Sequence, residues 1–333
     1  MSDPACRIFL QILMKKTTLK DIAEKAGVSA ALVSNYLNRN PSARMSDETR
    51  RKIDAALKEL DYHGSAIARS LRTGKSRIIG YVSAALRTEV SRQEMMAVFN
   101  AAAEREYQIF VAYSPEKEMT LRNIRMLRER GCDAVIVSGF FSEEFSREIC
   151  SISSNIIILN THPAAEIPGK ILRYDYRAAV REAILYLQSK GHENICYQTA
   201  YDSSFEQRYL EFTLFYGKEN VWYPENNLPS VEEFAGYIKK HKCTAMLHVN
   251  DFHAMRTIQN CAALNIRVPQ DLAVVGFDNI TAADYTTPTL SSISRPLTEA
   301  ANIAVNHLIA LINGEESELP PSLPCKFIPR GSI

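Results

Sequence analysis

The chain has 333 residues, of which 46% are hydrophobic, so it can bury a sizeable core and is long enough for about two domains. Its formal net charge of +1 hides an uneven distribution. Residues 14–77 contain 14 Lys and Arg against 7 Asp and Glu, whereas residues 78–333 contain 24 against 30. A basic N-terminal region followed by an acidic chain is typical of a protein that binds a polyanion through its N-terminal region alone. No apolar run reaches the roughly 18–20 residues of a membrane span, so we expect no membrane partner.

The seven cysteines are scattered along the chain and include no CxxC pair. This pattern predicts reduced thiols in the core of a cytoplasmic protein, with neither disulfides nor a metal site. Residues 1–13, MSDPACRIFLQIL, have no clear basic lead and no small-residue cleavage site, so a signal peptide is not predicted. Met14 can serve as the natural start, and we expect the residues before it to be a disordered extension.

Residues 18–38, TLKDIAEKAGVSAALVSNYLN, predict two short helices joined by a tight turn. Apolar residues repeat at helical spacing until Gly27 breaks the pattern. Ser29 can cap a second helix, in which Val33 and Leu37 would face the first. This is the layout of a helix-turn-helix, whose second helix can lie in the major groove of DNA. A helical hairpin without a DNA role would show the same pattern.

A third helix is predicted from residue 47 to about residue 60, with Ser46 as its cap and one apolar face that can close over the first two helices. Arg50 lies near its start, on the opposite side, where it is well placed for a backbone phosphate. We therefore expect residues 14–61 to form a small all-α DNA-binding domain.

Residues 62–77, YHGSAIARSLRTGKSR, form a separate basic segment. A short helix can form over Ala66–Leu71 and end at Gly74, but alone it is too short to be stable in water. It would be ordered only when something packs against it. The alternative interpretation is a basic interdomain linker.

From residue 78 onward the sequence alternates between strand-like and helical patterns. Continuous apolar strands separated by amphipathic helices predict parallel sheets covered on both faces, here as two doubly wound α/β subdomains. A boundary is expected in the Pro- and Ala-containing stretch from residue 163 to 169. Ligands bind open sheets of this kind at the carboxyl ends of the strands, and the cleft between the subdomains is the natural pocket. The expected strands lie at 78–84, 108–113, 134–139, 156–160, 193–200, 244–249 and 272–277, and the expected helices at 91–106, 118–130, 176–190, 203–217, 230–241, 251–264 and 297–312.

The predicted helix-turn-helix, the segment ARSLRTGKSRIIGYV and the block VPQDLAVVGFDN together resemble the lac and galactose repressor (LacI/GalR) family of bacterial transcription regulators. The resemblance implies a periplasmic-binding-protein-like body that dimerises and binds a small-molecule effector, a sugar or a related metabolite, without a cofactor. It also implies that the dimer binds a near-palindromic double-stranded DNA operator. Chains of this family cross between the subdomains three times, which implies one subdomain at about 78–162 and 293–320 and the other at about 163–292 and 321–333.

The resemblance further implies which residues contact DNA. Ala30, Ala31 and Asn35 fall on the positions that face bases, and Leu71 on the hinge-helix leucine that wedges into the minor groove. Asn35 stands where the family often has Arg; asparagine pairs with adenine whereas arginine favours guanine, so the half-site is expected to differ. The full expected DNA-binding set is Thr18, Ser29, Ala30, Ala31, Ser34, Asn35, Asn38, Arg50, Ala68 and Leu71.

For the effector, Arg208, Asn250 and Asp278 align with positions that hold polar groups of a small ligand in this family. Arg208 could instead form a surface ion pair, and Asp251 is expected to cap a helix. Sugar-binding members carry aromatics after the first body strand, but the matching stretch here is TEVS, which offers none. Arg87 nearby is therefore a candidate contact to an anionic effector.

Two other classes of protein share parts of this pattern. A solute-binding protein without a DNA role would have the same body, but it predicts a secretion signal and no basic head. An α/β enzyme is disfavoured because the sequence contains no GxSxG elbow, no P-loop and no GxGxxG after the first body strand. We predict no catalytic residues, and the histidines show no metal-ligand spacing.

Overall fold

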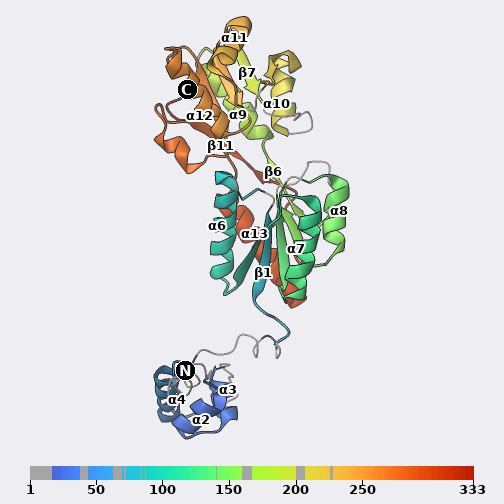
Figure 1. Ribbon diagram of the computed structural model, residues 1–333, viewed down its shortest axis with the longest axis vertical. Helices are drawn as coiled ribbons and strands as arrows, with labels where there is room; N and C mark the ends of the chain where they lie inside the picture. The colour runs from blue at the N-terminus through green and yellow to red at the C-terminus, as the bar shows by residue number, and fades with distance from the viewer. Residues whose placement is uncertain are drawn as a thin grey trace, which may run out of the picture. The chain divides into compact units, whose positions relative to one another are not determined.

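The computed structural model describes residues 17–37, 44–62, 70, 73–83, 85–86, 88–139, 141–159, 167–199, 207–225 and 228–333. The chain divides into two compact units, the head, Met1–Ser76, and the body, Arg77–Ile333 (Figure 1). The extension expected at residues 1–13 lies outside the described residues, as does most of the hinge helix expected at 66–71. The described Gly74 donates its N–H to the carbonyl of Ser70 at 2.8 Å.

Three helices around a small apolar core form the described part of the head. The centre of the core is made by Ile22, Val33 and Ile53, one side chain from each helix, all fully buried. Leu37, which was expected to face the first helix, is 38% exposed and is not among the residues of this core. It is the last residue of its helix. The helices are α2 (Leu19–Ala26), α3 (Ala30–Leu37) and α4 (Asp47–Glu59).

The first sheet of the body is parallel throughout, with its strands in the order β2-β1-β3-β4-β5. Successive residues of β3 point to opposite faces: Ile136 is buried with α6 and α13, whereas Val135 and Val137 are buried with α7 and α8. Helices on both faces of a parallel sheet are the expected doubly wound arrangement. The elements are β1 (Ile78–Ser83), β2 (Gln108–Tyr113), β3 (Ala134–Ser138), β4 (Ile156–Leu159), β5 (Ile171–Leu172), α6 (Glu89–Ala103), α7 (Lys117–Glu129), α8 (Glu143–Ser151) and α13 (Leu297–Asn313).

The second sheet has the strand order β13-β11-β10-β9-β7-β8. All of its pairings are parallel except that of β13 with β11, an antiparallel edge that the sequence did not predict. Apolar residues of α9 and α10 are buried on one face, and those of α11 and α12 on the other. The elements are β7 (Ile195–Gln198), β8 (Val221–Trp222), β9 (Ala245–His248), β10 (Ala273–Phe277), β11 (Ser291–Ser294), β13 (Lys326–Ile328), α9 (Arg177–Ser189), α10 (Gln207–Tyr216), α11 (Val231–His241), α12 (Asp251–Ala263) and the short 3-10 helices η1 (Lys218–Asn220) and η2 (Thr281–Tyr285).

The chain crosses between the two sheets three times: from β5 to β6, from β11 to α13, and from α13 to β13. Figure 1 shows α13, late in the sequence, lying among the early elements of the first sheet, and it packs against α6. Because β5 pairs with β4, the first sheet continues past the boundary expected near residue 163. At the crossings, β6 (Tyr174–Asp175) pairs with β12 (Leu323–Pro324). We call the first sheet with its helices the first subdomain, and the second sheet with its helices the second subdomain.

Cys196 in β7 and Cys243 just before β9 form a disulfide, so the prediction of reduced thiols is wrong for this pair. The two residues are 47 positions apart in the sequence, and only the pairing of β7 with β9 brings them together. The other described cysteines carry free thiols: Cys132, Cys150, Cys261 and Cys325.

Candidate DNA-binding head and effector site

Local sequence builds the turn between α2 and α3. Thr18 caps α2, because the N–H of Asp21 donates to its hydroxyl at 3.3 Å and its own N–H donates to the Asp21 carboxylate at 2.7 Å. Gly27 ends α2 at φ 67°, a left-handed conformation that suits a residue without a Cβ. The hydroxyl of Ser29 then accepts the N–H of Leu32 at 3.2 Å, so α3 starts directly after the turn.

The first turn of α3 offers small side chains to its surroundings. Ala30 and Ala31 are exposed, and Ser34 and Asn35 farther along the helix are half-buried. Short side chains at the start of a recognition helix let its backbone approach base edges closely, and methyl groups can contact the thymine methyl. The structure thus places four of the expected DNA-contacting residues on one short helix.

Helix α4 fixes the position of α3. The hydroxyl of Tyr36 donates to the carboxylate of Asp54 at 2.5 Å, which ties the two helices together. Ser46 caps α4 as predicted, accepting the N–H of Thr49 at 3.2 Å. Arg50, one turn into α4, is exposed and available for a phosphate. Four of the predicted site residues lie outside the described residues: Asn38, Ala68, Leu71 and Arg87.

In the body, Asp278 directly follows β10, at the carboxyl end of the strand. Its backbone φ is 101°, a strained value for a residue with a Cβ, and strain of this kind clusters at functional sites. An Oδ1 atom of Asp278 lies 3.1 Å from Nη2 of Arg295, and only 14% and 7% of the two side chains are exposed. Arg295 belongs to the crossing from β11 to α13, and its role was not predicted from the sequence.

Arg208 is positioned by aromatic rings and a carbonyl. It lies near the start of α10, where Nη1 donates to the carbonyl of Val249 at 2.6 Å. Its guanidinium carbon lies 5.4 Å from the ring centre of Tyr176 and 5.3 Å from that of Phe277, the residue before Asp278. The structure therefore brings Arg208 and Asp278 to the same end of the second sheet, as the resemblance implied.

Asn250, and not Asp251, caps the helix that begins after β9. Asn250 caps α12, because its Oδ1 accepts the N–H of His253 at 3.0 Å. Asp251 is fully buried, accepting the N–H of Ile280 at 2.8 Å and the hydroxyl of Ser292 at 2.6 Å. The expectation that Asp251 caps a helix is therefore wrong. Burial raises the pKa of Asp251 to about 7, although both hydrogen bonds act in the opposite direction.

The sequence reasoning also missed a buried carboxylate in the first subdomain. Glu94 of α6 is 3% exposed and accepts hydrogen bonds from the hydroxyls of Tyr81, at 3.0 Å, and Ser138. The hydroxyl of Tyr174 lies 3.5 Å from the other carboxylate oxygen, and burial raises the pKa of that tyrosine, which keeps its proton in place. Arg295 lies 5.4 Å above the Tyr174 ring. A continuous set of contacts thus joins Asp278 in the second subdomain to Glu94 in the first.

The described residues include no group of three or more His, Cys, Asp and Glu side chains that could hold a metal ion. None of the helices they form is both long and apolar enough to cross a membrane.

Two parts of the chain match models of known protein families. Residues 18–65 match the model for bacterial regulatory proteins of the lacI family, and residues 184–333 match that for a periplasmic binding protein-like domain. The chain is 25% identical to the HTH-type transcriptional repressor PurR of Serratia proteamaculans, covering 95% of this chain and 96% of that one. It is 28% identical to the NTD biosynthesis operon regulator NtdR of Bacillus subtilis, covering 95% and 99%.

The fold agrees with a solved structure of the lac repressor dimer bound to operator and the anti-inducer ONPF. The TM-score is 0.81 at 21% identity, over 96% of this chain and 99% of that one. The predicted fold class, a helix-turn-helix head with a periplasmic-binding-protein-like α/β body, is confirmed. The chain thus combines a DNA-binding domain of the lacI family at residues 18–65 with a periplasmic binding protein-like domain at residues 184–333.

Proposed function

We propose that the chain is a cytoplasmic transcriptional repressor that binds a near-palindromic operator as a homodimer, with its DNA affinity set by a small-molecule effector. The observation that carries the proposal is a capped helix-turn-helix with small, exposed side chains on α3, joined in one chain to a binding-protein-like body. The relatives named above are a transcriptional repressor and an operon regulator.

On the DNA side, α3 enters the major groove and Ala30, Ala31 and Asn35 meet the bases. The excess of 14 Lys and Arg over 7 Asp and Glu in residues 14–77 supports binding to phosphates. Arg50 and the capped start of α2 contact the backbone, and the leucine at position 71 wedges into the minor groove at the operator centre. Asn35 favours adenine at the position that an arginine would read as guanine.

A second copy of the chain has a suitable surface on the body. Met96 on α6, Phe252 on α12 and Tyr285 at the end of η2 are 52%, 57% and 82% exposed. The amide of Gln93 donates to the hydroxyl of Thr281 at 3.2 Å, which holds η2 beside α6 across the two subdomains. Exposed large apolar side chains on both subdomains support an interface that a dimer would cover. The lac repressor in the matching structure is a dimer.

On the effector side, Arg208, Asp278 and Arg295 offer charged hydrogen-bonding groups beside the rings of Tyr176 and Phe277. An aromatic face with a few fixed polar groups suits a sugar or a related metabolite, and half-buried Tyr176 is the accessible ring here, because Phe277 is fully buried. Binding would favour one arrangement of the two subdomains over the other, and the head would respond to that shift.

Two alternatives are less well supported. A solute-binding protein would need only the body, and the helix-turn-helix match at residues 18–65 favours the regulator. An α/β enzyme is disfavoured because the sequence contains no GxSxG elbow and no P-loop, so the proposal assigns the chain no catalytic step.

The proposal is tested by selecting genomic fragments with the purified full-length chain. We expect recovery of near-palindromic sequences with adenine at the position read by Asn35. The matched control is the full-length Ala31→Glu variant, which places a negative charge on the exposed face of α3 and should recover none of them. Equal recovery by both proteins, or fragments without a shared motif, would remove the basis of the proposal.

A further inference from the structure

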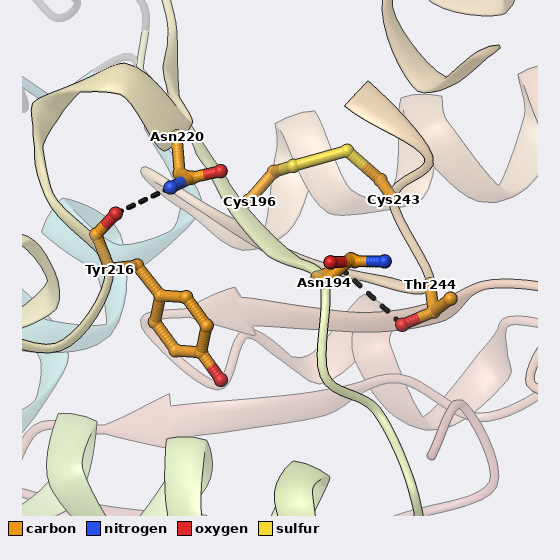
Figure 2. The surroundings of a disulfide bond; sticks show 6 residues. All are labelled: Asn194, Cys196, Tyr216, Asn220, Cys243 and Thr244. Atoms are coloured by element: carbon orange, nitrogen blue, oxygen red, sulfur yellow. Dashed lines mark hydrogen bonds between the residues drawn. A yellow bond between two sulfur atoms is a disulfide. The ribbon is translucent and has the colours of Figure 1, made fainter. Parts of the chain in front are cut away.

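The disulfide between Cys196 and Cys243 joins two parts of the second subdomain that strand pairing already holds together. The two Cα atoms are 6.3 Å apart, and the N–H of Thr244 donates to the carbonyl of Asn194 at 2.9 Å beside them. Figure 2 shows the bond between Cys196 and Cys243 beside Asn194 and Thr244, where a dashed line marks a second hydrogen bond, from the Thr244 hydroxyl to the Asn194 carbonyl. The geometry therefore needs no rearrangement of the backbone for the two sulfur atoms to meet.

The two cysteines differ in access to solvent. Cys196 is 1% exposed and lies in the core under α11 and α12, whereas Cys243 is 9% exposed. Cys243 follows the sequence Lys239-Lys240-His241-Lys242, whose lysines are exposed. Positive charge beside a cysteine stabilises the thiolate, which is the reactive form. Cys243 is thus the member of the pair that a small molecule would reach first.

The other described cysteines form no disulfide, and three of them have strongly raised thiol pKa values. Burial raises the pKa of the Cys261 thiol, in the same core, to about 12, and that of Cys325 to about 12. Burial also raises the pKa of Cys150 to about 11. Thiols held protonated in this way are poor nucleophiles. Among the described cysteines, the pair Cys196 and Cys243 combines proximity to a partner thiol with a positively charged approach.

We propose that Cys196 and Cys243 form a reversible redox pair, through which small-molecule disulfides control the stability of the second subdomain. The proposal rests on the proposed function in one respect: a regulator that works among intracellular DNA meets a reducing environment, where protein disulfides are usually transient, catalytic or sensing. A permanent structural bond is not expected there.

The reaction is a thiol–disulfide exchange in two balanced steps. The Cys243 thiolate attacks one sulfur of the small disulfide RSSR, forming a mixed disulfide and releasing one thiol, RSH, after proton uptake. The Cys196 thiolate then attacks the Cys243 sulfur, forming the internal bond and releasing the second RSH. Two protein thiols are oxidised while one small disulfide is reduced to two thiols. An excess of RSH drives the same steps backward.

Oxidation would stabilise the strands that carry part of the effector site. Residues of β7 and β9 pair along their length, and the N–H of Val249 donates to the carbonyl of Gln198 at 2.9 Å at the far end. The carbonyl of the same Val249 accepts the hydrogen bond from Arg208. The disulfide at one end of the β7–β9 pair therefore limits how far Gln198 and Val249 can separate at the other end.

The experiment equilibrates the native full-length chain in glutathione buffers ranging from fully reduced to fully oxidised, followed by alkylation and mass spectrometry. We expect Cys196 and Cys243 to pass together from alkylated to disulfide-linked, and to return on addition of dithiothreitol. Closing a loop of 47 residues should raise the melting temperature of the oxidised chain by roughly 5–15 °C. The Cys196→Ser variant should instead accumulate glutathione on Cys243, because the second step is blocked.

The Cys261→Ser variant is the matched control, since it changes a buried thiol of the same core and should keep the full redox response. A bond that survives excess reduced glutathione in the native chain would show a permanent structural disulfide and overturn the proposal. Two thiols that stay alkylatable in fully oxidised glutathione would overturn it as well. These readouts need no DNA, so a failure of the repressor assignment would be seen separately.

Discussion

At the scale of single residues, the second subdomain holds two nearby carboxylates in different ways. Asp278 is paired with Arg295, whereas Asp251 is buried and held by an N–H and a hydroxyl. Gly276 makes room for the second arrangement, because a Cβ at that position would lie 2.1 Å from the Asp251 carboxylate. The Asp278 carboxylate has an ion-pair partner, whereas the Asp251 carboxylate is held by hydrogen bonds.

This difference predicts a pH dependence for Asp251. Burial raises the pKa of Asp251 in the folded chain from 3.8 to about 7. The contribution of its protonated form to the free energy of unfolding is therefore complete below pH 4 and is lost as the pH rises through 7. The Asp251→Asn variant removes the charge, while its amide oxygen accepts the N–H of Ile280 and its amide NH2 donates to the hydroxyl of Ser292. We expect the variant to gain stability relative to the native chain between pH 4 and 7, by about 3 kcal/mol at most. Melting temperatures across this range measure the difference.

Asp271 provides the control for this prediction. It is exposed, and hydrogen bonding to Arg267 lowers its pKa to about 2, the opposite direction. The Asp271→Asn variant should therefore show no gain as the pH rises from 4 to 7. A parallel pH profile for the native chain and the Asp251→Asn variant would contradict the assignment of a buried, raised-pKa carboxylate.

At the scale of elements, the head depends on local signals that a short helix cannot do without. Helix α2 has only 8 residues, so its capping box contributes much of the helix's stability. We expect Thr18→Ala to destabilise the head by about 1 kcal/mol, because it removes both side-chain contacts to Asp21. Thr18→Ser retains the cap and should remain close to the native chain. Thermal unfolding of the head, followed by circular dichroism, checks both; equal stability of the two variants would show that the cap contributes nothing.

The sequence was sufficient for the long elements and insufficient for the short ones. Continuous apolar strands such as Ala134–Ser138 and amphipathic helices such as Leu297–Asn313 carry a period that identifies them. Two-residue strands such as Ile171–Leu172 have no period, and they exist only because a neighbouring strand pairs with them. This is why the first sheet extends beyond its expected limit.

The same reason separates the predicted and the missed parts of the site. Arg208 and Asp278 were found through the resemblance to a family, although their role as effector contacts stays a prediction. Arg295 and Glu94 were missed, because their significance comes from contacts between segments far apart in the chain. The disulfide partners were missed for the same reason: a separation of 47 residues carries no spacing signal.

At the scale of the whole molecule, the exposed apolar side chains of the body predict the consequence of losing the dimer. Tyr285 is 82% exposed, so Tyr285→Asp should leave the fold unchanged while placing a charge in the proposed interface. We expect the variant's mass by light scattering to halve, and its operator affinity to fall at least tenfold because one head must bind alone. Leu214→Asp is the control: that residue is 78% exposed on α10, outside the proposed interface, and should leave the mass unchanged. An unchanged mass for Tyr285→Asp would place the dimer contact elsewhere.

The central claim is that this chain reads an operator through its basic head, as a dimer. It is tested most directly by titrating the full-length chain onto a recovered near-palindromic duplex at several salt concentrations. The account predicts two chains per duplex and an affinity that falls steeply, by roughly 10³-fold or more between 50 and 200 mM salt, as phosphate contacts release counterions. Absence of binding, or an affinity that does not change with salt, would contradict it.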